Sequence, residues 1–163
     1  MDNKKKILVI DDEEDLCLLV KDNLEHAGQY VVRVLSNPHE AEKACLEFMP
    51  DVILLDVVMP ERKGGDVAEA LRADPRTRRI PIIIMSGLGE MVYLKKRDEW
   101  KWLPNRPIVH QRGDVIKEHN PERAAQAYGV DDYIAKPFVT GALIQVIEDA
   151  IVRKKEEEKE KEK

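Results

Sequence analysis

The sequence predicts an α/β protein in which helices cover both faces of a parallel β-sheet. The order of apolar and amphipathic segments supports this fold class, and the length and composition support a single domain. Short, continuously apolar segments alternate along the chain with longer amphipathic segments, as expected for buried parallel strands that are joined by helical crossovers. The chain has 163 residues, of which 43% are hydrophobic, and this fits one domain with a substantial core.

Five segments are predicted to be strands. The first four are residues 7–10, 31–35, 52–55 and 82–85, and a shorter fifth strand covers 133–135. Most of these runs contain no polar residue, which is typical of strands that are buried on both faces.

Helices are predicted between and after these strands, over residues 16–24, 38–48, 66–73, 120–129 and 139–152. Leu16, Leu19, Val20 and Leu24 have the spacing of one apolar helix face. Asn37 is a suitable N-cap for the second helix, with Pro38 at its first position.

Two regions depart from the alternation. Residues 90–120 form an unusually long connection between the fourth strand and the next helix. Residues 154–163 are only Lys and Glu, so they are either a solvated helix extension or a disordered tail. We therefore expect one domain over 1–153, with an insertion at about 90–120, followed by a charged tail over 154–163.

Bulk composition argues against several classes of partner. The formal net charge of −5 provides no general attraction to nucleic acid or anionic membrane. No segment approaches the roughly 20 apolar residues of a membrane span, and nothing at the start resembles a signal peptide. Cys17 and Cys45 match neither a disulfide framework nor a zinc site and are expected to be buried apolar groups. A cytoplasmic location is the expectation.

Polar residues follow the predicted strands where a ligand site is expected. In open parallel sheets, ligands bind beyond the carboxyl ends of the strands. The residues found there are Asp11 and Asp12, Asp56, Ser86 and Lys136. Three neighbouring carboxylates need a cation, and hard oxygen ligands without histidine or thiolate favour Mg²⁺.

Phosphoryl transfer is the chemistry that these residue types support. Asp56 could attack a phosphoryl donor and form an aspartyl-phosphate. Lys136 could pair with the incoming charge, and Ser86 could donate a hydrogen bond to a phosphoryl oxygen. Because positioning and charge neutralisation dominate such transfers, no dedicated base is required. Each of these residues has an ordinary structural explanation when it is taken alone; their joint occurrence at strand ends favours function.

Four blocks of sequence resemble, in order, those of the receiver domains of bacterial two-component response regulators. They are ILVIDDE at 7–13, DVVMP at 56–60 with Gly64, SG at 86–87, and DDYIAKPF at 131–138. The resemblance covers residues 4–153 apart from the insertion. It implies a flavodoxin-like, doubly wound, five-stranded parallel sheet of order 2-1-3-4-5, the order that also describes chemotaxis receivers.

The resemblance also implies a role for individual residues. Asp56 would accept a phosphoryl group from a sensor histidine kinase or phosphotransfer protein. Asp11, Asp12, Asp56 and the backbone carbonyl of Val58 would hold Mg²⁺, with Asp11 acting partly through water. Ser86 and Tyr133 would form a switch pair, and the Lys136–Pro137 peptide would be cis. A downstream protein, not nucleic acid or membrane, would read the switch.

Two features depart from the family. Ser86 and Lys136 lie 50 positions apart, which makes this connection about 25 to 30 residues longer than in ordinary receivers. The insertion contains Trp100 and Trp102, and tryptophan beside basic residues is the composition of binding hot spots. A partner surface and a lid on the domain itself are both compatible with this composition, and a helix is expected to begin near Met91.

The second departure concerns the lifetime of the phosphorylated state. Val58 and Leu88 lie two residues after Asp56 and Ser86. Neither side chain can orient an attacking water, which predicts slow self-dephosphorylation.

The sequence is compared with three functional classes. The leading prediction is a phosphorylation-controlled signalling switch that is not an enzyme acting on a separate substrate. A haloacid-dehalogenase-type phosphatase would need a second aspartate two residues after the nucleophile, where this chain has Val58. A receiver-like scaffold that takes no phosphoryl group is the third class. The chain would be either a stand-alone relay or a piece of a longer regulator.

Overall fold

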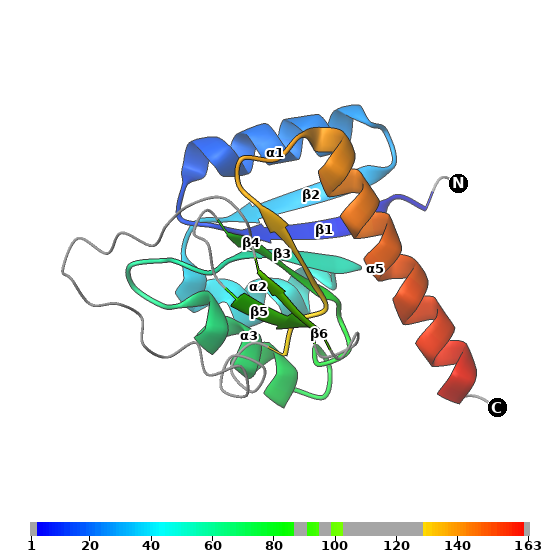
Figure 1. Cartoon of the computed structure of the whole chain (residues 1–163). Helices are drawn as coiled ribbons and strands as arrows, with labels where there is room; N and C mark the ends of the chain where they lie inside the picture. Colours follow the sequence, from blue (N-terminus) through cyan, green and yellow to red (C-terminus); the bar gives the residue numbers. More distant parts are fainter. Residues whose placement is uncertain (1–2, 87–90, 95–98, 103–128, 162–163) are drawn as a thin grey trace.

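The computed structural model describes residues 3–86, 91–94, 99–102 and 129–161 (Figure 1). Its main feature is a five-stranded sheet with the strand order β2-β1-β3-β4-β7. The strands are β1 (Lys5–Ile10), β2 (Tyr30–Leu35), β3 (Val52–Asp56), β4 (Ile82–Ser86) and β7 (Asp132–Ala135). All four strand pairings are parallel. The predicted fold class and strand order are therefore confirmed, with β7 as the fifth strand of the predicted order.

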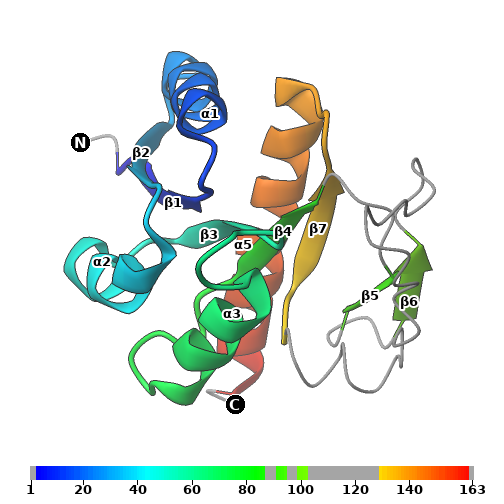
Figure 2. The same cartoon turned by 90° about the vertical axis from the view of Figure 1, so that its left-hand side faces the viewer.

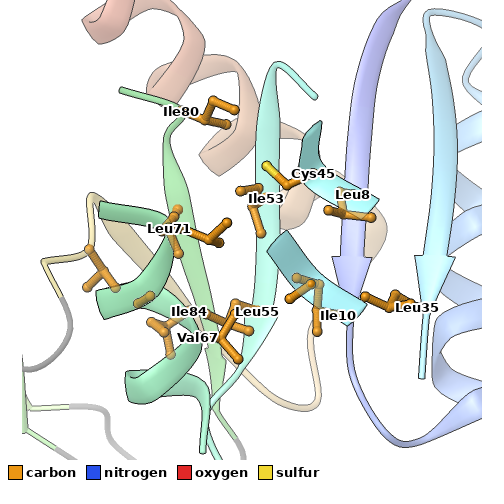
Figure 3. Close-up of a cluster of buried hydrophobic side chains, with 14 of the residues drawn as sticks. Leu8, Ile10, Leu35, Cys45, Ile53, Leu55, Val67, Leu71, Ile80 and Ile84 are labelled. Carbon is orange, nitrogen blue, oxygen red and sulfur yellow. The ribbon is translucent and has the colours of Figure 1, made fainter. Parts of the chain in front are cut away.

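The strands alternate their side chains between two apolar layers. Leu8, Ile10, Ile53 and Leu55 belong to one buried cluster (Figure 3), whereas Ile7, Val9 and their neighbours belong to the other. The central strands are accordingly inaccessible to solvent on both sides, which explains their continuously apolar sequences.

Helices supply the other half of each layer (Figure 2). Helices α2 (Ala41–Phe48) and α3 (Gly64–Ala73) cover one face of the sheet, and α1 (Glu14–His26) and α5 (Thr140–Lys161) cover the other. A short 3₁₀ helix, η1 (Pro38–Glu40), precedes α2. As predicted, Asn37 caps this segment, since its side chain accepts a hydrogen bond from the backbone N–H of His39 at 3.1 Å.

The apolar face of α1 differs in one position from the prediction. Val20 and Leu24 are buried, but Leu19 is 57% exposed and Cys17 is buried in its place. Successive helical residues are turned by about 100°, so a face centred between Val20 and Leu24 includes Cys17 and leaves Leu19 on the flank. Both cysteines are free and buried, as expected.

The start of the insertion is extended, and the predicted helix near Met91 is wrong. Strands β5 (Met91–Leu94) and β6 (Glu99–Trp102) form a separate antiparallel two-stranded sheet. The composition favours this outcome, because β-branched and aromatic residues are enriched in strands and Glu99–Trp102 alternates charged and aromatic residues. The register pairs Met91 with Trp102 and Tyr93 with Trp100, which places these four positions on one face of the hairpin. The helix expected over 120–129 lies almost wholly outside the described residues.

Two arginines anchor the chain where it re-enters the sheet after the insertion. Arg72 of α3 donates hydrogen bonds to the carboxylate of Asp131 at 2.8 Å and to the carbonyl of Gly129 at 2.9 Å. Arg153 of α5 donates to the carboxylate of Asp132 at 2.6 Å. The beginning of β7 is thus held from both faces of the sheet.

Helix α5 continues well past the predicted end at residue 152. It runs to Lys161, and its last buried residue is Ile151, so its final turns extend beyond the sheet (Figure 1). Of the two possibilities for the charged tail, the helical extension is the one observed through Lys161. Within the described segments, no helix has both the length and the apolarity that crossing a bilayer requires.

Candidate functional site

Three aspartates meet at the carboxyl edge of the sheet, where the strand-end rule placed them. Asp11 and Asp12 follow β1, and Asp56 ends the neighbouring strand β3. One carboxylate oxygen from each of these residues lies within 4.8 Å of the other two. Asp11 is inaccessible to solvent and Asp56 is 5% exposed, whereas Asp12 is exposed. The cluster is therefore open to solvent chiefly on the side of Asp12.

Lys136, which directly follows the edge strand β7, brings a positive charge to this cluster from two strands beyond β3. Its Nζ lies 2.6 Å from Oδ2 of Asp11 and 3.3 Å from Oδ1 of Asp56. Burial opposes its charge, but the hydrogen bond to Asp11 and the charge of Asp56 together raise the pKa of Lys136. The lysine is therefore a permanent cation that faces the phosphoacceptor candidate, and the Lys136–Pro137 peptide is cis, as expected.

Asp11 is held in place by several hydrogen bonds. While Oδ2 accepts from Lys136, Oδ1 accepts a 2.9 Å hydrogen bond from the backbone N–H of Glu13, at the start of α1. Beneath it, the thiol of Cys17 donates to the backbone carbonyl of Asp11 at 3.2 Å. Burial, followed by the charge of Asp11, raises the pKa of this thiol to about 12, so Cys17 is an unreactive part of the support.

Asp56 is held in an unfavourable electrostatic environment. Burial raises its pKa from 3.8 to about 6, and the charge of Asp11 adds to the increase, while Lys136 opposes it. An ionised carboxylate at this position therefore gains from any additional cation. A carboxyl group whose pKa is raised by burial and by a neighbouring like charge is typical of functional sites.

The donor set suits a hard divalent cation. The group consists only of carboxylate oxygens, with no imidazole or thiolate among the three residues, and such ligands select Mg²⁺ or Ca²⁺ over softer metals. Both oxygens of Asp11 already accept hydrogen bonds, from Lys136 and from the backbone N–H of Glu13, whereas Lys136 uses only one oxygen of Asp56, so Asp12 and Asp56 are the better candidates for direct ligands. The carbonyl of Val58 stays a predicted ligand.

Other predicted site residues are placed only through their backbones. Ser86 ends β4, one strand from Asp56, and Tyr133 lies in β7. Their side chains lie outside the described part of the structure, and so do those of Trp100 and Trp102. The switch pair and the tryptophan surface therefore stay predictions.

The structure gives Gly64 a role that was not specified from the sequence. Its N–H donates to the carbonyl of Val57 at 3.0 Å, and a Cβ at this position would lie 2.2 Å from the backbone oxygen of Asp56. Only glycine permits so close an approach. The glycine therefore sets the path of the loop that follows the phosphoacceptor candidate, a constraint that a single glycine in a motif indicates only once its neighbours in space are known.

The fold and the site together define a class: doubly wound α/β proteins with a cluster of aspartates and a lysine at the carboxyl edge of the sheet. Comparison with known proteins identifies the family within this class. The profile described as "Response regulator receiver domain" matches residues 7–97. The chain belongs to the response regulator receiver domain family.

Two relatives show the range of the family's architectures. The chain is 32% identical over 144 residues to the chemotaxis protein CheY of Thermotoga maritima, covering 88% of this chain and 94% of that protein. It is also 32% identical over 153 residues to the phosphate regulon transcriptional regulatory protein PhoB of Rhizobium meliloti, covering 93% of this chain and 54% of that protein. The chain thus spans about half the length of the transcriptional regulators that it matches.

Solved structures agree on the fold. A CheY-like receiver domain protein from Methanospirillum hungatei superposes with a TM-score of 0.70 at 18% identity, covering 95% of this chain and 99% of that one. The receiver domain of the histidine kinase PA1611 from Pseudomonas aeruginosa superposes with a TM-score of 0.65 at 24% identity, covering 91% of this chain and 98% of that one. The latter structure is described as having a magnesium ion coordinated in the active site cleft.

Proposed function

We propose that this chain is a phosphorylation-dependent signalling switch that accepts a phosphoryl group on Asp56 in a Mg²⁺-dependent reaction. The donor is a sensor histidine kinase or a phosphotransfer protein. The single observation that carries the proposal is the position of the Asp56 carboxylate, which is grouped with Asp11 and Asp12 and lies 3.3 Å from the ammonium of Lys136.

The bound metal would supply charge neutralisation for the carboxylates and for the transferred group. Asp12 and Asp56 would hold it directly, with Asp11 as a further oxygen. This assignment rests on the all-carboxylate donor set and is supported by the magnesium described for the PA1611 receiver domain. Magnesium fits better than calcium, because it binds through one or two carboxylates and keeps several waters.

The chemical step is an in-line displacement at phosphorus. An oxygen of the Asp56 carboxylate attacks the phosphorus atom, a new P–O bond forms, and the P–N bond to the donor histidine breaks. The bonding electron pair leaves with the imidazole. Lys136 faces the carboxylate at 3.3 Å and would donate to an oxygen of the transferred group, offsetting its charge.

The product is a change of state in the chain and not a released compound. In this proposal the chain does not turn over a separate substrate, since only transfer to and loss from Asp56 occur. Ser86 and Tyr133 would relay the change to a downstream protein. The histidine kinase P4 of Formosa agariphila is among the chain's relatives, at 28% identity over 90 residues, and this supports a place in a two-component phosphorelay.

Intact-mass measurement tests the proposal directly. The chain is incubated with acetyl phosphate and Mg²⁺ beside an Asp56→Ala variant. We expect a gain of about 80 Da, the mass of one phosphoryl group, in the unmodified chain alone. No adduct, together with failure of beryllofluoride to bind, would exclude the proposal and favour the receiver-like scaffold.

A further inference from the structure

A small hollow opens beside the aspartate cluster, among the loops that follow β1, β2 and β3. It has a volume of about 320 Å³ and is lined by Asp12, by Ser36, Asn37 and Pro38 after β2, and by Pro60 and Glu61 after β3. Its size is at the lower end for small-molecule sites, so it suits one side chain. Through Asp12 it adjoins the cluster, but no step of the proposed phosphoryl transfer uses its other residues.

The two walls of the hollow are tied to each other. Arg62, in the loop after β3, forms two hydrogen bonds with the carboxylate of Glu42, at 2.8 and 2.7 Å. The same guanidinium donates to the carbonyl of Pro38 in the opposite wall, at 3.2 Å. Since Asn37 also caps η1, the hollow is preformed and needs no rearrangement to accept a ligand.

The charge of the hollow is negative. Glu61 contributes a carboxylate beside that of Asp12, whose charge a bound Mg²⁺ would share, and the positive charge of Arg62 is already engaged by Glu42. His39 lies 3.9 Å from Glu61, but both side chains are more than half exposed, and an exposed pair at this distance is worth little. Glu61 is therefore open to a stronger cationic partner.

The walls also offer apolar surface. Pro38 and Pro60 face the same space as the two carboxylates, and rigid pyrrolidine rings provide flat surfaces for a hydrocarbon stem or a planar guanidinium. A side chain that combines an apolar stem with a planar, multiply donating cation matches this combination better than any other.

We propose that this hollow receives an arginine side chain of the protein that delivers the phosphoryl group. The inference rests on the proposed function. The donor is favoured over a downstream reader because the hollow shares Asp12 with the cluster and opens at the same edge of the sheet as Asp56. An arginine seated there would align the donor histidine with the acceptor.

Binding is tested with N-acetyl-arginine amide, using its uncharged analogue N-acetyl-citrulline amide as the matched probe. Both are titrated into the full ¹⁵N-labelled chain with Mg²⁺ present, and amide shifts are followed by NMR. We expect shifts at Ser36, Asn37 and Glu61 with arginine and not with citrulline. The Glu61→Gln variant should weaken this binding about three- to tenfold; Glu69→Gln, an exposed carboxylate on α3, should not.

Transfer is tested with synthetic phosphohistidine peptides that carry arginine or citrulline near the phosphohistidine. The arginine peptide should phosphorylate Asp56 about three- to tenfold faster, and Glu61→Gln should remove the difference. Equal binding of both probes, or shifts confined to Asp11 and Lys136, would refute the arginine seat. Binding with equal transfer rates would refute the assignment to the donor. Acetyl phosphate labelling of the unmodified chain separates these failures from failure of the proposed function itself.

Discussion

The ammonium of Lys136 lies 2.6 Å from Oδ2 of Asp11, a residue that solvent does not reach, although the two are 125 positions apart. This pair places a cation inside the acidic cluster before any metal binds. Two effects are therefore expected of Lys136: it should stabilise the metal-free fold, and it should weaken the binding of a divalent ion to the same carboxylates.

Replacing this lysine should separate the two effects. In EDTA, Lys136→Met should lower the free energy of unfolding by about 3 kcal/mol, because it leaves a buried carboxylate without its partner. The same variant should bind Mg²⁺ more tightly than the unmodified chain, and Mg²⁺ should restore part of its stability. Denaturant unfolding and calorimetric Mg²⁺ titration measure both. Lys159→Met, at the exposed end of α5, is the control, and weaker Mg²⁺ binding by Lys136→Met would contradict the argument.

Asp56 should make the metal-free chain less stable as pH rises. Its pKa is raised from 3.8 to about 6 by burial and by Asp11, so the folded chain holds this proton more tightly than the unfolded chain. The favourable contribution is complete below pH 3.8 and is lost as pH rises through 6. In EDTA at pH 7.5, Asp56→Asn should therefore be about 1 to 3 kcal/mol more stable than the unmodified chain.

The stability gain of Asp56→Asn should shrink toward pH 4.5, where the native carboxyl is largely protonated, and also in Mg²⁺. Asp22→Asn, on the exposed side of α1, should show neither trend. A pH-independent gain at position 56 would mean that packing, and not ionisation, is responsible.

Local patterns were sufficient to predict the sheet and the polar residues at its edge. Apolar runs such as residues 52–55 identify buried strands without reference to the rest of the chain, and the carboxyl ends of parallel strands meet at one edge of the sheet. The grouping of Asp11, Asp12 and Asp56 follows from that rule. The sequence was less informative about which residues of α1 face the core. Leu19 is as apolar as its neighbours, but Cys17 is the residue that is buried.

Contacts between distant segments could not be predicted in the same way. Arg72 and Asp131 are 59 positions apart, and nothing in either local sequence indicates their pairing. The hollow beside Asp12 likewise depends on two loops that meet only in the folded chain. The β5–β6 hairpin was missed for a different reason: the spacing of Met91 and Leu94 suits a helix, and the alternation in Glu99–Trp102 is only four residues long.

The insertion should be removable without loss of the fold. The part of 92–119 that the structure describes, within β5 and β6, lies in a separate two-stranded sheet, and the start of β7 is anchored by Arg72 and Arg153. Replacing 92–119 by a short flexible linker should leave cooperative unfolding and acetyl phosphate labelling of Asp56 intact. Loss of partner binding alone would support a partner surface that includes Trp100 and Trp102, whereas unfolding of the deletion variant would favour the lid.

The phosphorylated state should be long-lived. Val58, two residues after Asp56, is 55% exposed and has no group that can orient an attacking water. The Val58→Asn variant supplies such a group and should shorten the half-life of the aspartyl-phosphate by about threefold or more, which is within the range of positioned polar catalysis. Val139→Asn changes another exposed valine, after β7, and should leave the half-life unchanged. Equal half-lives for all three chains would show that water access is controlled elsewhere.

Gly64 and Gly141 should respond in opposite directions to the same substitution. A Cβ at Gly64 would lie 2.2 Å from the backbone oxygen of Asp56 and 2.9 Å from the Cα of Val57, so Gly64→Ala must displace the loop that follows Asp56. We expect a loss of about 3 kcal/mol or more and weaker Mg²⁺ binding. Gly141, in the first turn of α5, has no atom within 4 Å of its Cβ position, so Gly141→Ala should stabilise the chain by up to about 1 kcal/mol. Unfolding and Mg²⁺ titrations on both variants check this contrast, and normal Mg²⁺ binding by a folded Gly64→Ala chain would show that the loop's path does not control the metal site.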